Sequence, residues 1–570
     1  MEQRVNAEGR PAYGPGYDAL GQGYLAIGDY EKARDLLQKA WDKGYQQPST
    51  AYALGKVMGH LYDDELRKAE RLQSADLRKQ KRKEAEDNYG RPSIEYLKKA
   101  GSYVESPLYV EALVDLYEKR FDQALKKATD AYSGSSWPYE PKKLEGDIHM
   151  AMGLNAEESG DYKKTISEYD VAGKKYLEAA DLARSNEEIY LALGERYSSS
   201  IGVESQSSEQ RKDLYENGLD SCKKALIANP DSGRAYLCLS QTYLKQGIYV
   251  LYWEDADPNP LFTKAIEMAE RAGEKLHNAE PYIAASAAYV RLAERATAAR
   301  TDARPYLQNA IKKAEQALVI DKQSTAYHSM ASAYFLLGDY ELFHGGNPIP
   351  ALQKVIEIYR NDSEQLSSTQ ETVQNTLGLA YLDMAEYKLQ RGQNPTDELQ
   401  KSIDHYKRGL KSNAKASYIA LNVALAYNDL ATYELSQGQS PQKSCDEALI
   451  YYDKAQADNK NQVYTSNNKG LIYLLLGKYL QMQNKDPDEV LQKAVAYFEE
   501  SLKLNPKLGY GYINAGSALT VQAEYMIENG KDPAEVLKKA ESQAENGRQL
   551  SDEFFEAYEV LGQVHLIRAR

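Results

Sequence analysis

The glycines near the start of the chain are the first candidates for chemistry. Gly14-x-Gly16-x-x-Ala19 and Gly21-x-Gly23-x-x-Ala26 satisfy the loose pattern in which a glycine-rich turn brings backbone amides close to a dinucleotide pyrophosphate. Such a site needs a preceding strand that aims the next helix at the phosphates, and no strand pattern precedes either motif. The second motif also falls inside a predicted helix. We therefore predict no nucleotide cofactor.

Histidine and cysteine form no recognisable catalytic or metal site. The seven histidines are far apart, and none is paired with another ligand type at the spacing of a helical metal site. Cys222, Cys238 and Cys445 cannot all pair and have no CxxC neighbour, which fits a reduced, cytosolic protein. Paired acid and base groups, a nucleophile with its base and a phosphate loop are also missing. We expect no enzymatic activity, no metal and no cofactor in this chain.

A run of basic residues is the first candidate for partner binding. Guanidinium and ammonium groups bind phosphate oxygens well, so the run could dock an acidic or phosphorylated partner. Its candidate residues are Arg78, Lys79, Lys81, Arg82 and Lys83. Three acidic residues, Glu84, Glu86 and Asp87, follow closely and offset the charge. A solvated helix face is the favoured interpretation.

Three asparagines are the second candidate. Asn422, Asn468 and Asn514 recur at intervals of 46 residues. On one face of successive helices they could form a ladder of amides that binds the backbone of a peptide. Strict spacing also follows from repetition alone, so packing between helices is the favoured interpretation.

Helical repeats must position these residues. The small and aromatic residues near the start follow the order of a 34-residue helical hairpin, in which small residues let helix A lie close to helix B. They are Leu20-Gly21, Tyr24, Gly28, Tyr30, Ala33, Leu37 and Ala40, and Leu54-Gly55 repeats the first pair 34 residues later. This pattern matches tetratricopeptide repeats (TPRs).

The repeat lengthens from about residue 250. Prolines recur at 260, 305, 348, 395, 441, 487 and 533, at intervals of 43 to 47 residues. Most follow a turn in which Gly or Asn ends helix A, Asp, Asn or Ser caps helix B, and Pro occupies the first turn of helix B. The sequence thus predicts hairpins of about 46 residues in the C-terminal part.

Two columns of aromatic residues follow this longer repeat. Eight residues before the prolines stand Tyr252, Tyr340, Tyr387, Tyr433, Tyr479 and Tyr525, and eleven residues after them stand Tyr359, Tyr406, Tyr452 and Phe498. Aromatic residues at fixed helical spacing are usually core. We expect the two columns to form one continuous aromatic core.

Composition restricts the class of protein further. The 570 residues are 42% hydrophobic and 27% charged, which suits amphipathic helices, and the formal net charge of −14 disfavours nucleic acid as a partner. No stretch is apolar enough to span a membrane, and the start lacks the apolar run of a signal peptide. We expect a soluble, cytoplasmic protein.

The fold class predicted from these patterns is all-α, a right-handed superhelical solenoid of TPR-like antiparallel hairpins. The polar segment from Ser198 to Ser208 is the best candidate for a boundary between two arrays. We predict an N-terminal array over residues 1–198, with a charged helical insertion near residues 61–88, and an array of longer repeats over residues 209–570.

Some residues carry a closer family resemblance. They are Trp137-Pro138-Tyr139-Glu140, Lys143-Leu144-Glu145-Gly146-Asp147, Leu182-Ala183-Arg184-Ser185-Asn186 and the Gly-x-Asn/Asp-Pro turns. The combination resembles the C-terminal repeat region of large bacterial serine/threonine protein kinases, in which a kinase domain precedes a TPR array. The HRD loop, the DFG motif and the Gly-rich loop of a kinase are absent from this chain. The chain begins almost directly in a repeat, as a fragment of a longer kinase would.

The resemblance implies a docking or sensory region of a kinase signalling protein. The function we predict is a non-catalytic protein-interaction scaffold whose partner, a protein or peptide, lies on side chains of the A helices. Self-association is compatible with the same surface. The alternatives are a stand-alone TPR adaptor or assembly factor with no kinase connection and, least favoured, an enzyme with an unrecognised site.

Overall fold

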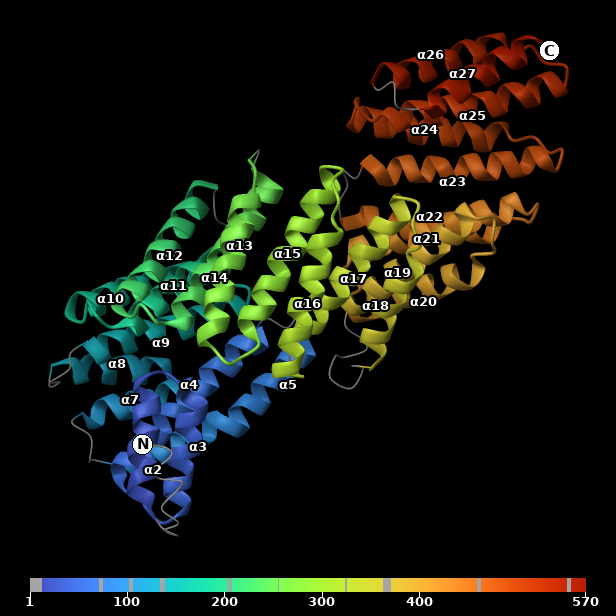
Figure 1. The fold of residues 1–570 in the computed structure, drawn as a ribbon. Helices are drawn as coiled ribbons and strands as arrows, with labels where there is room; N and C mark the ends of the chain where they lie inside the picture. The colour runs from blue at the N-terminus through green and yellow to red at the C-terminus, as the bar shows by residue number, and fades with distance from the viewer. Residues whose placement is uncertain are drawn as a thin grey trace. The chain divides into compact units, whose positions relative to one another are not determined.

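The computed structural model describes residues 13–70, 75–101, 106–133, 139–201, 203, 208–254, 256–322, 325–361, 371–458, 463–550 and 555–570. These residues form helices and turns without any strand, and consecutive helices pair into antiparallel hairpins (Figure 1). The chain is an all-α superhelical repeat, as the sequence predicts. Among the described helices, none has both the length and the apolar character needed to cross a membrane.

The chain divides into two compact units, residues 1–336 and 337–570. The helices of the first unit are α2 (Gly14–Ala26), α3 (Tyr30–Asp42), α4 (Pro48–Glu70), α5 (Ala75–Ala85), η1 (Glu86–Gly90), α6 (Arg91–Ala100), α7 (Pro107–Tyr117), α8 (Phe121–Tyr132), α9 (Tyr139–Glu158), α10 (Tyr162–Leu182), α11 (Glu187–Ile201), α12 (Ser208–Ala228), α13 (Gly233–Trp253), α14 (Asn259–Lys275), α15 (Glu280–Ala298) and α16 (Arg304–Ile320). Helix α17 (Ala326–Phe343) contains the division between the units.

The second unit continues with α18 (Ile349–Asn361), α19 (Glu371–Gln390), α20 (Thr396–Ser412), α21 (Ser417–Ser436), α22 (Gln442–Asp458), α23 (Val463–Met482), α24 (Asp488–Leu504), α25 (Gly509–Glu528), α26 (Ala534–Leu550) and α27 (Phe555–Arg568). The division predicted between residues 198 and 209 concerns the change of repeat type and stays a prediction. Part of that segment is helical, because α11 continues to Ile201 and α12 begins at Ser208.

Two kinds of helix alternate along each unit. In the second unit, α19 contacts α21, α21 contacts α23, and α23 contacts α25. Each A helix therefore touches the A helix of the next hairpin. The B helices α20, α22, α24 and α26 each pack mainly on the A helices before and after them. In a curved stack of hairpins, the helices on the inner side are closer together than those on the outer side. Contacts between alternate helices are therefore expected only on the inner side. The A helices therefore form the inner surface of the unit.

The turns between helix A and helix B follow the predicted chemistry. The residue that ends helix A has a positive φ, from 53° to 73°, at Gly345, Gly392, Gly438, Asn484 and Gly530. Two residues later an Asn, Ser or Asp side chain accepts a hydrogen bond from a backbone amide of helix B, as between Asn394 and Thr396 at 2.9 Å. The proline differs slightly from the prediction, since Pro395 and Pro487 stand one residue before the helix.

The two aromatic columns do not form one core. The column on the B helices is buried as predicted, and Tyr406, Tyr452 and Phe498 are fully buried. In the column on the A helices Tyr340 is buried, but Tyr387, Tyr433, Tyr479 and Tyr525 are only half-buried and Tyr252 is 58% exposed. The prediction is wrong for most of this column.

The cysteines also differ from expectation. Cys222 of α12 and Cys238 of α13 form a disulfide between helix B of one repeat and helix A of the next, so the expectation of reduced cysteines is wrong for this pair. Cys445 is free and fully buried on α22. Burial, with the negative charges of Asp446 and Glu434, raises the pKa of its thiol to about 12.

We expect a maleimide reagent to label no cysteine in the folded, non-reduced protein. Denaturation without reductant should expose one thiol, that of Cys445, and denaturation with reductant should expose three. Intact mass spectrometry after labelling counts the adducts. Three adducts without reductant would contradict the disulfide.

Candidate functional site

The predicted asparagine ladder lies between neighbouring A helices of the second unit. The Asn422 side-chain amide donates to Oδ1 of Asn375 on α19 at 2.9 Å, and the Asn514 amide donates to Oδ1 of Asn467 on α23 at 3.1 Å. Asn468 lies beside the hydroxyl of Tyr452. All three asparagines are half-buried. The amides of Asn422 and Asn514 therefore link successive A helices, whereas Asn468 contacts the B helix α22.

The predicted basic run is in the first unit, on the short helix α5. Lys81 pairs with Glu84 at 2.8 Å, so part of its charge is compensated on the same helix. Lys79 and Lys83 are exposed, and Arg82 is half-buried beside Tyr62 of α4. The side chain of Arg78 is outside the described residues. The basic run and the asparagines belong to different units of the chain.

A row of acidic side chains occupies the inner surface of the second unit. Asp339 comes from α17, Asp383 and Glu386 come from α19, and Asp429 comes from α21. The aspartates are half-buried, whereas Glu386 is exposed. Each aspartate is influenced by a neighbouring carboxylate: Asp339 and Asp429 by Glu386, and Asp383 by both Asp339 and Glu386. We call these four residues the acidic row.

Burial and mutual repulsion change the protonation of the acidic row. Burial, together with the charges of Asp339 and Glu386, raises the pKa of Asp383 to about 8. Burial and the charge of Glu386 raise the pKa of Asp429 to about 7, and burial raises the pKa of Asp339. A carboxyl group without a compensating cation is expected to behave in this way. Within the described part of the unit, none of the four carboxylates takes part in an ion pair.

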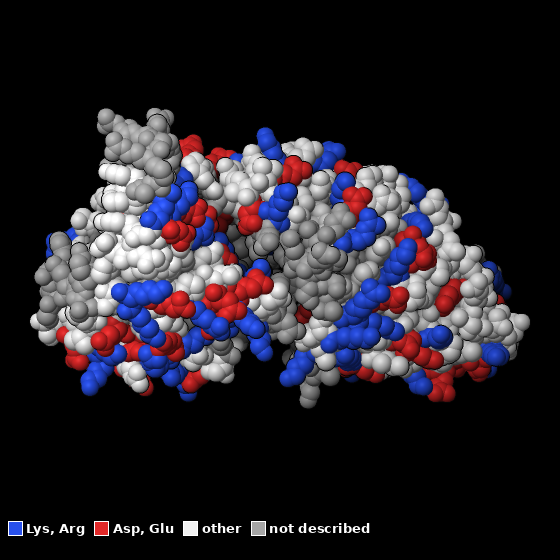
Figure 2. All heavy atoms as spheres, turned by 90° about the horizontal axis from the view of Figure 1, so that it is seen from below, with Lys and Arg blue, Asp and Glu red and all other residues white. Residues whose placement is uncertain are grey.

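The acidic row differs from the rest of the charged surface. On the outer helices, Asp397 pairs with Lys401 at 2.7 Å and Glu489 pairs with Lys493 at 2.9 Å. On the face seen in Figure 2, Lys and Arg side chains lie next to Asp and Glu side chains over most of the surface. Paired surface charges of this kind contribute little to stability. The acidic row contrasts with these paired carboxylates of the outer helices.

Buried polar atoms without partners adjoin the acidic row. Oδ2 of Asp383 and Oδ1 of Asn428 are buried and form no hydrogen bond. The hydroxyls of Tyr406 and Tyr452 are also buried, with Ser402 and Asn468 as their side-chain partners, and Asp383 and Asp429 act on the pKa of Tyr406. Buried polar groups are normally satisfied, and the oxygens of Asp383 and Asn428 are not.

The acidic row is not arranged as a metal site. Among the described residues, no group of three or more His, Cys, Asp or Glu side chains is close enough to hold a metal ion. The carboxylates belong to successive A helices, and packed helices are about 8–10 Å apart. Oxygen ligands of a shared cation must lie within about 2.6 Å of it.

A network of paired charged and polar side chains joins several helices of the first unit. Arg234 of α13 pairs with Glu188 of α11, and both contact the hydroxyl of Tyr30 at the start of α3. The Tyr30 ring stacks on His60 of α4 at a centroid distance of 4.4 Å. Lys143 of α9 pairs with Asp147 of the same helix at 2.9 Å. These contacts join the first hairpins to α11 and α13.

Protonation in this network follows from burial and partner charges. Burial opposes ionisation of Glu188, but Arg234, His60 and Lys143 outweigh it and lower its pKa to about 2. Burial lowers the pKa of His60 to about 3, so the ring is neutral at pH 7. The network therefore contributes to the structure of the unit and has no unpaired group to offer a ligand.

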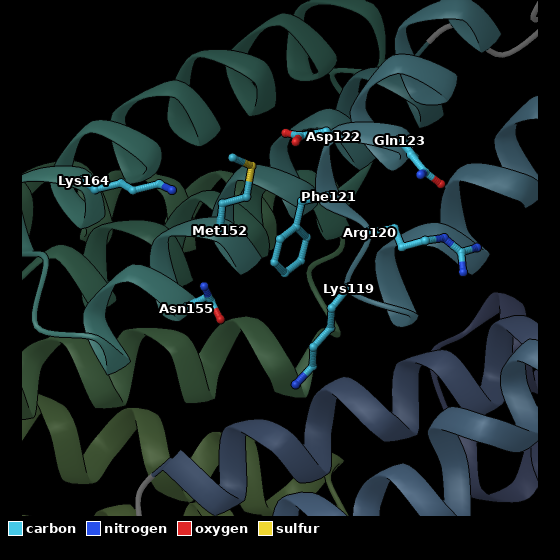
Figure 3. A pocket seen from close by; sticks show the side chains of 8 residues that line it. All are labelled: Lys119, Arg120, Phe121, Asp122, Gln123, Met152, Asn155 and Lys164. Carbon is cyan, nitrogen blue, oxygen red and sulfur yellow. The ribbon is translucent and has the colours of Figure 1, made fainter.

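A surface pocket of about 330 Å³ lies at the turn between α7 and α8 and extends to α9 and α10. Phe121 and Met152 lie at its centre, with Lys119, Arg120 and Lys164 around them (Figure 3). Arg120 pairs with Asp115 and Glu118, and its two lysine neighbours are exposed. None of the eight side chains that line the pocket has a buried polar atom without a partner. It is not preorganised for a specific ligand.

The sequence reasoning missed the acidic row. The sequence nevertheless contained an indication of it, which appears when the repeats are aligned on their prolines. Asp383 and Asp429 each stand 12 residues before a proline, and the next two repeats have Leu475 and Val521 at that position. Asp339 and Glu386 each stand 9 residues before a proline, where the later repeats have Thr432, Lys478 and Glu524. Carboxylates in a column otherwise occupied by Leu and Val are the detectable departure.

Comparisons with known proteins give similarity in fold only. No family model matches the chain, and no curated protein matches it. Among solved structures it is similar to yeast Tom70, with 12% identity, a TM-score of 0.33 and coverage of 98% of this chain and 96% of that chain. It is also similar to human IFIT1 in a dimer with PPP-AAAA, with 13% identity, a TM-score of 0.38 and coverage of 90% and 95%.

A third similar structure is TTC0263, a thermophilic TPR protein of Thermus thermophilus, with 18% identity and a TM-score of 0.28. It is matched over 98% of its own length by 40% of this chain. The repeats of the present chain are TPR-like in the order of their helices and in the stacking of A helices on one another.

Proposed function

We propose that this protein is a non-catalytic scaffold that binds an extended segment of a partner protein along the inner surface of its second unit. The observation that carries the proposal is a pair of buried oxygens without a hydrogen-bond partner on successive A helices, Oδ2 of Asp383 and Oδ1 of Asn428. A polypeptide in extended conformation has unpaired amide and carbonyl groups along its whole length. It can satisfy such atoms on several successive helices at once.

The residues expected to take part belong to the A helices. Asn422, Asn468 and Asn514 line the same surface and contribute amide groups that contact a peptide backbone. The basic run of α5 would be a separate, weaker contact for an acidic partner. The net charge of −14 and the acidic row both favour a protein over a nucleic acid as partner.

Site-specific photocrosslinking tests the proposal. A photoreactive amino acid at Thr432, an exposed position on α21 in the inner column, should give adducts with a partner in the source cells. The same amino acid at Lys443, an exposed position on the outer helix α22, is the matched control and should give few. Adducts of equal yield at both positions, or adducts at Lys443 alone, would contradict the proposal.

The identity of the crosslinked partner also decides between finer hypotheses. The sequence resemblance supports a role as the docking or sensory repeat region of a bacterial serine/threonine kinase signalling protein. A kinase domain, or a kinase substrate, in the adduct would favour that role. A partner without any relation to phosphoryl transfer would favour a stand-alone adaptor or assembly factor, and an adduct with a second copy of this chain would favour self-association.

A further inference from the structure

The acidic row gathers negative charge without a compensating positive charge from the described part of the unit. Asp339, Asp383, Glu386 and Asp429 place four carboxylates on three successive A helices, and the described part of the unit supplies no ion pair to any of them. The charges that act on Asp383 are those of Asp339 and Glu386, which are both negative. A folded chain gains nothing from collecting like charges on a half-buried surface. A positively charged group of a binding partner would lower the electrostatic repulsion among these carboxylates.

The position of the unpaired atoms points in the same direction. Oδ2 of Asp383 on α19 and Oδ1 of Asn428 on α21 have no hydrogen-bond partner, and both belong to the A helices that carry the acidic row. An amide oxygen can accept a hydrogen bond, as a carboxylate does. A lysine ammonium has three donors and an arginine guanidinium has five, so one such group can satisfy a carboxylate and a second oxygen together.

The spacing between the carboxylates indicates what kind of positively charged partner could contact all of them. Neighbouring packed helices are about 8–10 Å apart, and three residues of an extended polyproline II segment, which complete one turn and return to the same face, span about 9 Å. Basic side chains at every third position of an extended segment would therefore meet one A helix each. The row ends after α21, because Lys478 of α23 occupies the position that corresponds to Glu386. A segment of about seven residues is long enough to cover it.

We propose that the inner surface of the second unit binds a partner segment rich in lysine or arginine, with basic residues about three positions apart, and that Asp339, Asp383, Glu386 and Asp429 supply the recognition. The inference rests on the proposed scaffold function and names the chemistry of its partner. Asp383 and Asp429 are the central contacts, because they are half-buried and stand on adjacent helices beside Tyr406.

A set of designed peptides tests the inference on the full chain. The probe is a fluorescein-labelled peptide with lysine at every third position and serine and alanine between. One comparison peptide has the same composition with its lysines consecutive, and another has glutamine in place of lysine. Fluorescence anisotropy gives the dissociation constants. We expect the spaced lysine peptide to bind most tightly and to bind more weakly as salt is added.

Two double variants with the same net charge separate the site from general attraction. The binding assay is done at about pH 9, where Asp383 and Asp429, with pKa values of about 8 and about 7, are ionised in the free chain. Under these conditions Asp383→Asn with Asp429→Asn removes two charges of the acidic row and should weaken binding of the spaced peptide about tenfold or more. Asp397→Asn with Glu489→Gln removes two charges from exposed positions on the outer helices and should leave binding unchanged. Equal loss in both variants would mean attraction to the overall negative charge and would overturn the inference.

The remaining outcomes distinguish this inference from the proposed function. If the glutamine peptide binds as tightly as the lysine peptide, and both compete with the crosslink at Thr432, the basic partner is refuted and the scaffold proposal stands. If no peptide binds and Thr432 gives no adduct, both fail. Circular dichroism of each variant confirms that it is folded, so that weaker binding reports the lost carboxylates.

Discussion

Asp383→Asn should make the second unit more stable at pH 8, even though it removes a native side chain. The pKa of Asp383 is raised from an ordinary value of 3.8 to about 8 in the folded chain, mainly by burial and then by Asp339 and Glu386. The folded state therefore binds this proton more tightly than the unfolded state between pH 3.8 and pH 8. Stability falls as the pH rises through that range.

The asparagine variant lacks the titrating group and should lose this part of the pH dependence. We expect a gain in the free energy of unfolding on the order of 2 kcal/mol at pH 8, shrinking toward zero near pH 4. Asp429→Asn should act in the same direction with a midpoint near pH 7, because its pKa is raised to about 7. A gain that comes with weaker peptide binding would show that the acidic row is maintained for function at the expense of stability.

Hydrogen exchange measures this change within the unit concerned. Peptides from α19 and α21 should exchange more slowly in the variant at pH 8, after correction for intrinsic exchange rates, while peptides from the first unit serve as an internal reference. Asp397→Asn is the matched control on the outer helix α20, where the carboxylate is paired with Lys401 and no gain is expected. Faster exchange in Asp383→Asn at pH 8 would contradict the raised pKa.

Gly378→Ala is the second substitution with a large expected effect, and it should destabilise the second unit. A Cβ at this position of α19 would lie 2.4 Å from Cε1 of Tyr406, whose ring is fully buried and cannot move away freely. Overpacking of a well-packed core costs about 1–3 kcal/mol. That cost exceeds the gain of about 1 kcal/mol that alanine brings to a helix interior. We therefore expect a net loss of stability in the second unit.

Gly562→Ala is the matched control for this substitution. Gly562 is also inside a helix, α27, but no atom lies within 4 Å of the place that its Cβ would occupy. The same change should therefore stabilise the chain by up to about 1 kcal/mol. Urea denaturation followed by circular dichroism reports both units, whereas tryptophan fluorescence reports the first unit alone, because the three tryptophans are at positions 41, 137 and 253.

A second variant shows whether the clash is the cause. In a Tyr406→Leu background the ring is gone, and Gly378→Ala should then be neutral or stabilising. If Gly378→Ala destabilises the chain equally in both backgrounds, the close approach of Tyr406 is not the reason. If it leaves the wild-type chain as stable as before, the packing of Tyr406 against α19 is looser than the structure indicates.

Local sequence patterns predicted the fold well because each repeat has its own stop and start signals. Gly392 ends one helix with a positive φ and Asn394 caps the next, and both depend on a few neighbouring residues. The buried column of Tyr406, Tyr452 and Phe498 followed from spacing alone. The half-buried tyrosine column did not, because its burial depends on how far each neighbouring helix extends.

The candidate site also combines features that the sequence predicts with features that only the tertiary structure sets. Asn422 and Asn514 were visible as a period, but their hydrogen bonds to Asn375 and Asn467 depend on the offset between adjacent A helices. The disulfide between Cys222 and Cys238 depends on which sides of α12 and α13 face each other. Sequence spacing gives the face of one helix, and only packing decides which residue of the next helix meets it.

By itself the sequence determined the helical repeat, its two periods, the turn chemistry and the small residues at close contacts, because all of these are set within one hairpin. The tertiary structure alone decided which charges are compensated. Lys401 and Asp397 pair on one helix and are predictable from their spacing, whereas Asp383 and Asp429 stand 46 residues apart and come near the same side chain, Tyr406, only through stacking. Because electrostatic energy depends on distance and burial, the uncompensated carboxylates could be identified only in the folded chain.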